Sequence, residues 1–314
     1  MSAGPFAGIG LALVATISYN IGLILEKRAL GRMPALDIRH AIRVLFSLFA
    51  NAGWLGGFAL MLTGLACQTI VLSFEPVSLV QPVLASGIAL VIVLSRVVLR
   101  ERLGSAESWC VAAMAVCVVL LALSTGGTSS QAGHDVRGIA MTAVVVPSLL
   151  AGLVIATKPL RSRPFGRHRA PVSGICYGLG TGLLYGVASL AIKGLSGVVV
   201  HNRHSAGLLA TGLATSPYLY LFGGCAVTAM LLFQVALQSC RASIVVPVSS
   251  VTSTLYFLVV GTWLFHEHLP ASPDKLGLRL TGIAAAGLVL VALARQVPSG
   301  SPDYTPAPRS ESWR

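Results

Sequence analysis

Two stretches of this chain combine a proline with hydroxyl or amide side chains inside otherwise apolar sequence. The first stretch contains Gln81, Pro82 and Ser86, and the second contains Pro247, Ser249, Ser250 and Ser253. Because proline removes one backbone donor and frees a carbonyl one turn earlier, each stretch can present several oxygen ligands at one level of a helix. Such oxygens could hydrogen-bond a polar solute or solvate a passing cation. The alternative is that the serines bond their own helix backbone.

Six further polar side chains are candidates for the same solute path, because polar groups in apolar helices usually face a cavity or another helix. These candidates are Tyr19, Asn20, Gln68, Tyr185, Gln234 and Tyr256. Gln68 and Gln234 could face each other and bind a solute, or bond to each other and lock the helices together. Either arrangement predicts that both amides are buried away from lipid.

Three charged residues beside apolar stretches are candidates for coupling transport to an ion, namely Glu26, Lys27 and Lys193. Glu26 is the best acceptor for a proton or a cation, because an acid near the mouth of a cavity can couple proton release to solute binding. Its basic neighbours favour the alternative of an interfacial ion pair, or of side chains that extend to the membrane surface. We expect Glu101 to be a solvated helix cap.

The sequence lacks the motifs of common catalytic and metal sites. It contains no Walker A loop, no HExxH or GxSxG motif and no cysteine or histidine spacing typical of zinc sites. We therefore expect no enzyme, no catalytic residue, no cofactor and no resident metal site. No acid lies in the middle of an apolar stretch, which weakens a Mg²⁺ path without excluding it, since that ion prefers carboxylate and other oxygen ligands.

Membrane-spanning helices are the elements that would position these groups. Of the 314 residues, 55% are hydrophobic and 10% are charged, whereas soluble domains have about 45–50% apolar and about 25% charged residues. Apolar runs of roughly 20 residues, the length of a spanning helix, occur nine times. They cover residues 6–25, 52–73, 77–95, 107–124, 138–157, 173–192, 217–239, 243–265 and 277–294. Residues 37–50 are expected to form a short amphipathic helix at the interface, with a tenth span as the alternative.

The net charge of +12 is unevenly distributed. Most of the 22 lysines and arginines lie in loops on one side of the nine spans, which by the positive-inside rule places the N-terminus outside and the C-terminus in the cytoplasm. Membrane topology therefore accounts for the positive net charge, and we expect no nucleic-acid partner. The expected partners are the lipid bilayer of the plasma (inner) membrane and a small-molecule or ion substrate, and a homodimer is left open.

An internal repeat divides the chain. Laying Gly8 on Gly174 aligns residues 8–31 with 174–197 and pairs Gln68 with Gln234. The predicted parts are a first repeat (1–125), a linking helix with a basic cytoplasmic loop (126–172), a second repeat (173–297) and a disordered cytoplasmic tail (298–314). Four spans, one extra span and four more spans bring the second repeat into the membrane from the opposite side, an arrangement found in many secondary transporters. The predicted fold class is an all-α polytopic membrane protein of nine transmembrane helices, with two inverted four-helix repeats joined by a central helix.

The order of these segments resembles the drug/metabolite transporter (EamA-like) superfamily, and within it the NIPA-type magnesium transporters. The resemblance is carried by NIGLILEKRALG (20–31), WLGGFALMLTGLACQTIVLSFEPVSLVQPV (54–83), ASGIALVIVLSRVVLRERL (85–103), IKGLSG (192–197) and ALQSCRASIVVPVSSVTSTLYF (236–257). It implies that a small polar or charged solute moves by alternating access through a central cavity between the repeats. It specifies the fold well and the substrate poorly.

Three functional hypotheses follow. The first is a secondary transporter of a small organic solute, and its alternative is a Mg²⁺ or other divalent-cation permease of the NIPA type. The third is a flippase of a lipid-linked intermediate or a membrane scaffold that transports nothing. A closed and fully apolar core between the first, third, sixth and eighth spans would exclude transport.

Overall fold

The structure is a computed structural model of the chain. It describes residues 5–34, 36, 40–74, 83, 86–101, 104–125, 138–161, 171–202, 205–264 and 272–296, and contains helices and turns but no strand within these ranges. The helices are α1 (Pro5–Leu30), α2 (Ala41–Phe49), α3 (Ala52–Phe74), α5 (Gly87–Val97), α6 (Ser105–Thr125), α7 (Gly138–Arg161), α8 (Pro171–Asn202), α9 (Ala206–Thr215), α10 (Pro217–Ser239), α11 (Ala242–Leu264) and α12 (Pro273–Gln296).

The helices confirm an all-α polytopic membrane protein. Within the described ranges, five helical segments are long and apolar enough to cross a bilayer, and a sixth is added if α2 and the first part of α3, bent by 87° at their junction, count as one span. Three shorter apolar segments lie within α5, α6 and α7. Each of the nine predicted stretches overlaps a helix; the third does so over residues 87–95, since residues 77–82, 84 and 85 lie outside the described residues, as does residue 265 of the eighth. The number of nine spans stays a prediction.

The first span is longer than the sequence predicts. We expected it to end at residue 25, before the charges, but α1 continues to Leu30 and its apolar span covers Gly8–Leu30. Glu26 and Lys27 therefore lie within a membrane-spanning helix. The charges did not end the helix because other helices cover their side chains, as described below.

Two short helices flank the longer ones. Residues 41–49 form the predicted amphipathic helix α2, whose Val44 and Leu48 are buried while Ile42 and Phe46 are exposed. Nine residues are too few to cross a bilayer, so α2 alone is not a tenth span. The helix α9 was not predicted, because a search for runs of about 20 apolar residues passes over a helix of ten.

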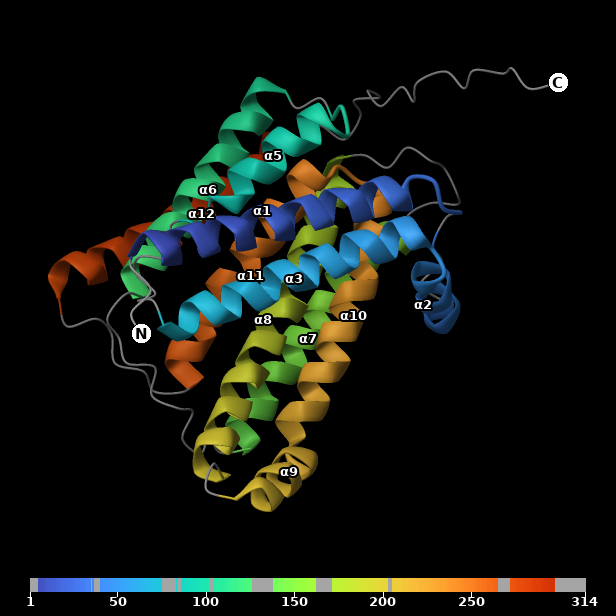
Figure 1. Cartoon of the computed structure of the whole chain (residues 1–314). Coiled ribbons are helices and arrows are strands. Elements are labelled where there is room, and N and C mark those ends of the chain that lie inside the picture. Colours follow the sequence, from blue (N-terminus) through green and yellow to red (C-terminus); the bar gives the residue numbers. More distant parts are fainter. Residues whose placement is uncertain are drawn as a thin grey trace.

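The helices form two groups that meet along α11 and α10 (Figure 1). In one group α1 packs along α3 and touches α5, while α6 packs along α12. In the other group α8 is central and contacts α7, α10 and α11. The α8–α11 contact depends on glycine: a Cβ atom added at Gly182 would lie 2.6 Å from Cβ of Thr252. Small residues at spacing four let helices approach closely where no hydrophobic force joins them.

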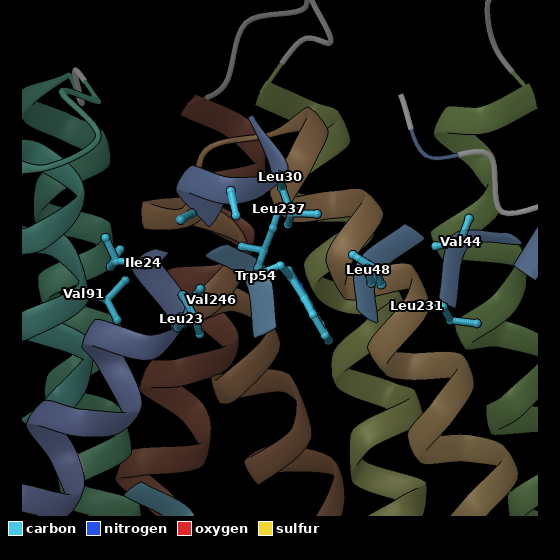
Figure 2. Close-up of a cluster of buried hydrophobic side chains, with 12 residues drawn as sticks. Leu23, Ile24, Leu30, Val44, Leu48, Trp54, Val91, Leu231, Leu237 and Val246 are labelled. Atoms are coloured by element: carbon cyan, nitrogen blue, oxygen red, sulfur yellow. The ribbon is translucent and has the colours of Figure 1, made fainter. Parts of the chain in front are cut away.

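A buried apolar cluster joins the two groups at the end of the bundle where α1 ends (Figure 2). It contains Leu23 and Leu30 from α1, Trp54 from α3, and Leu237 from α10. Trp54 is fully buried, and its ring stacks on that of Phe58 with centroids 4.9 Å apart. The cluster fixes the surroundings of Glu26 and Lys27, which lie between Leu23 and Leu30 in the sequence.

Candidate functional site

A buried carboxylate lies between the two helix groups. Glu26 of α1 is only 1% exposed. Its Oε2 accepts a hydrogen bond from Nε2 of Gln234 on α10 at 2.6 Å, and the other amide atom of Gln234, Oε1, accepts one from Nε1 of Trp54 at 3.3 Å. Within the described part of the chain, Oε1 of Glu26 has no hydrogen-bond partner. An unpartnered carboxylate oxygen in a buried site is costly, so this atom is suited to accept from a cation, a proton or a water molecule.

Glycine on the neighbouring helix makes room for this carboxylate. A Cβ atom at Gly57 of α3 would lie 2.8 Å from the backbone nitrogen of Glu26 and 3.1 Å from its Cγ. A Cβ at Gly22 would likewise lie 2.5 Å from the carbonyl oxygen of Gly57. Because neither helix carries a side chain at this crossing, α1 and α3 approach closely and hold Glu26 against α10.

Two predicted path residues surround the carboxylate. Tyr19 on α1 and Tyr185 on α8 lie close enough to Glu26 to interact with it electrostatically, and Tyr185 also lies near Tyr19. The ring of Tyr185 meets that of Phe233 edge to face, with centroids 6.1 Å apart. The structure therefore brings together Tyr19, Glu26, Tyr185 and Gln234 from three helices. Gln234 bonds to Glu26 and Trp54 rather than to Gln68, which is half-buried on α3.

Lys27 is held at the break between α10 and α11. Its Nζ donates to the carbonyl oxygens of Leu237 and Cys240 and lies 3.6 Å from Oε1 of Glu101. Glu101 in turn accepts hydrogen bonds from the backbone nitrogens of Ala242 and Ser243 at 2.9 and 3.1 Å, and from Oγ of Ser243 at 2.6 Å. The cation thus binds the carboxyl end of α10 and the anion binds the amino end of α11, in the favourable sense for both helix dipoles.

These contacts correct two expectations. Glu101 is 6% exposed and caps α11, so it is not a solvated cap of its own helix. Glu26 and Lys27 have polar partners inside the protein rather than extending to the membrane surface, and the ion pair that Lys27 forms is with Glu101. The sequence offered no signal that Trp54 or Glu101 belongs to this region, apart from the rarity of acids in the chain.

The hydroxyls of α11 mostly bond within the helix bundle. Ser249 accepts a hydrogen bond from Thr181 of α8 at 3.3 Å, and Ser253 donates to the carbonyl oxygen of Ser250 at 3.0 Å. Tyr256 donates to Oγ of Ser148 on α7 at 2.7 Å. Pro247 is buried within α11. This stretch therefore contributes polar contacts between helices, including bonds to its own backbone.

The other proline-containing stretch, residues 81–86, is only partly described by the structure. Gln81 and Pro82 lie outside the described residues. Ser86 is exposed and donates to the carbonyl oxygen of Val83 at 2.6 Å. Asn20 is buried, donates to the carbonyl oxygen of Thr16 at 2.7 Å, and packs where Gly87 of α5 leaves space. Lys193 is half-buried on α8, and Arg279 of α12 is a charged neighbour.

Comparison with known proteins identifies the family. The family model described as "Magnesium transporter NIPA" matches residues 5–297. This chain belongs to the NIPA magnesium transporter family. The resemblance stated from the sequence is thereby confirmed, including the wider drug/metabolite transporter superfamily to which this family belongs.

The NIPA-family relatives span kingdoms. The chain is 28% identical over 290 residues to a protein of Arabidopsis thaliana named "Probable magnesium transporter NIPA9", covering 90% of this chain and 81% of the relative. It is 24% identical over 305 residues to a "Probable magnesium transporter" of Candida albicans, covering 92% and 79%. A shorter match to human "Magnesium transporter NIPA4" is 30% identical over 100 residues, 32% of this chain and 25% of the relative. No solved structure matches the chain.

Membership of the NIPA family makes the chain a multi-pass membrane transporter rather than an enzyme. Among the residues that the structure describes, no group of three or more His, Cys, Asp or Glu side chains could hold a metal ion. A cation next to Glu26 would therefore not be held by three or more such side chains from the described ranges.

Proposed function

We propose that this NIPA-family protein moves Mg²⁺ across the membrane and that Glu26 is the acidic ligand on the path. The observation that carries the proposal is the unpartnered Oε1 of Glu26, an oxygen of a carboxylate that is 1% exposed. Burying such a charge without a counter-charge is costly, and a divalent cation at Oε1 would remove that cost.

The surroundings of Glu26 fit a transient site for a partly hydrated ion. Mg²⁺ keeps several waters and is usually bound through one or two carboxylates. Gln234 holds Oε2 of Glu26 and is itself held by Trp54, so the free oxygen has a fixed direction. Tyr19 and Tyr185 lie close enough to interact electrostatically with Glu26, and each carries a neutral hydroxyl of the kind that can hydrogen-bond a water shell. A site built on few acidic side chains favours release of its ion.

The alternatives are less well supported. The names of the relatives favour a cation over the organic solute that the uncharged polar residues suggested. A scaffold or a flippase receives no support from the names of these relatives. Moreover, the helices corresponding to the first, sixth and eighth predicted spans bury polar side chains. The buried polar residues are Thr16, Asn20, Thr181, Ser249 and Thr252.

We further propose that transport proceeds by alternating access between two inverted repeats, 1–125 and 173–297, with α7 in the linking segment 126–172. The helix contacts support this division, because α1 packs on α3 and α5 as α8 packs on α10 and α11. In this scheme the Lys27–Glu101 pair closes the cytoplasmic end, the N-terminus lies outside, and the protein resides in the plasma (inner) membrane.

Uptake into proteoliposomes containing a Mg²⁺-sensitive dye tests the proposal. Glu26→Gln keeps the size and the bond geometry of the side chain but removes its charge, and should reduce uptake at least tenfold. The matched control is Asp274→Asn, which removes one exposed acid at the start of α12 and should leave uptake unchanged. Full uptake by a folded Glu26→Gln protein would refute the role of Glu26, and absence of uptake by the wild type would refute Mg²⁺ transport.

A further inference from the structure

A surface hollow lies beside the end of α1, away from the Glu26 carboxylate. Its volume is about 460 Å³, within the range of about 300–1,000 Å³ typical of small-molecule sites. Its walls come from the last two turns of α1, the turn that follows α1, and the start of α3. They are formed by Leu25, Arg28, Ala29, Arg32, Asn51 and Gly53.

The hollow is positively charged. Arg28 lies in the last turn of α1 and Arg32 in the turn that follows it; both are exposed and both line the hollow. No acid lines the hollow, and neither arginine forms an ion pair with a described acid. Two guanidinium groups that line one hollow can bind one phosphate group with several charge-assisted hydrogen bonds.

The start of α3 adds to the positive electrostatic potential of the hollow. Oδ1 of Asn51 accepts a hydrogen bond from the backbone nitrogen of Trp54 at 2.9 Å, so Asn51 caps the helix and Gly53 lies in its first turn. The first backbone N–H groups of a helix have no partners within it, and the helix dipole favours an anion there. The two arginines and this helix terminus therefore attract an anion to the same hollow.

The neighbouring helix α2 places the hollow at the level of lipid headgroups. Ile42 and Phe46 of α2 are 72% and 73% exposed, Arg43 is exposed, and the opposite face of α2 packs on the protein. An amphipathic helix of this kind lies in the interface between lipid and water. Leu25, one turn further into the membrane than Ala29, is 38% exposed at the edge of the hollow. An acyl chain would contact this leucine when its headgroup occupies the hollow.

We infer that this hollow binds the phosphate headgroup of an anionic phospholipid from the leaflet that contacts α2. Free phosphate shares the same chemistry. The apolar edge at Leu25 and the interfacial helix favour the lipid, since a dissolved anion gains nothing from either. The inference does not depend on which substrate the protein transports.

The test measures lipid binding to the full-length protein in detergent by native mass spectrometry and thermal unfolding. Phosphatidylglycerol should bind and stabilise the wild type more than phosphatidylcholine or inorganic phosphate. The double variant Arg28→Gln, Arg32→Gln should weaken phosphatidylglycerol binding about tenfold or more, because charge-assisted hydrogen bonds are lost. The matched control Arg100→Gln, Arg295→Gln removes two exposed charges outside the hollow and outside α2 and should retain binding.

Three results would overturn the inference. Equal loss of binding in both double variants would mean attraction by net charge alone. Equal stabilisation by inorganic phosphate would identify a site for a free anion. Should the arginine variant fail to fold, Gly53→Leu keeps both arginines and fills the hollow, and unchanged lipid binding by that variant would also refute the site.

Discussion

Lys27 and Glu101 form an ion pair, with Nζ and Oε1 3.6 Å apart and side chains that are 14% and 4% exposed. The pair connects three places that are distant in the sequence: the end of α1, the segment after α5, and the break between α10 and α11. Lys27 binds the last carbonyls of α10, while Glu101 binds the first amides of α11. The two charges thus substitute for the backbone bonds that the helix break removes.

Breaking this pair should destabilise the protein strongly. Lys27→Met or Glu101→Gln alone leaves one buried charge without its partner, which typically costs about 3–5 kcal/mol. The double variant should recover part of the loss, because neither charge remains. Thermal unfolding of the four proteins in detergent, treated as a double-mutant cycle, measures the coupling. Additive losses would mean that the pair contributes nothing beyond separate contacts.

The bond between Gln234 and Glu26 can be tested in the same way. Gln234→Leu should cost about 1–3 kcal/mol, because both oxygens of the buried carboxylate then lack partners. Replacing both residues by leucine should cost less than Gln234→Leu alone, since no unpartnered carboxylate remains and only Nε1 of Trp54 loses its acceptor. The measurement is the change in unfolding temperature. If Gln234→Leu alone is neutral, the hydrogen bond does not contribute to stability.

Much of the fold follows from hydropathy, because lipid requires every span to be apolar and helical. The nine predicted stretches therefore overlap helices, and α2 follows from its amphipathic pattern. The ends of the spans are less predictable. Glu26 and Lys27 looked like the end of a span by their charge, yet α1 includes both. Whether a charge ends a helix depends on partners from distant helices, which hydropathy does not contain.

The candidate site could also be predicted only in part, because some of its contacts come from helices that are distant in the sequence. Tyr19, Tyr185 and Gln234 were predicted as path residues from residue type alone, and they lie around Glu26. Trp54 and Glu101 were not predicted as part of this region, because their importance comes from contacts with α10 and α11 that only folding creates. The internal repeat suggested that Gln234 pairs with Gln68, but a carboxylate is a stronger acceptor than an amide.

Membrane topology provides a further prediction. The segments before and after α7 are expected on opposite sides of the membrane, the first outside and the second in the cytoplasm. Cysteines introduced at Gly133 and Phe165 should therefore be labelled by an impermeant thiol reagent from opposite sides of sealed vesicles. The protein with only its native cysteines is the control. Labelling of both positions from one side would contradict the inverted arrangement.

The final prediction compares two neighbouring glycines of α3. A Cβ at Gly57 would collide with the backbone of α1 at Glu26, whereas a Cβ at Gly56 meets no atom within 4 Å. Gly57→Ala should therefore push α1 away from α3, cost about 1–3 kcal/mol of stability, and reduce Mg²⁺ uptake by displacing Glu26. Gly56→Ala should be neutral or stabilising by up to about 1 kcal/mol, since alanine favours a helix. Unfolding temperature and dye-based uptake for both variants test this difference. Equal behaviour would show that the close α1–α3 crossing does not position the carboxylate.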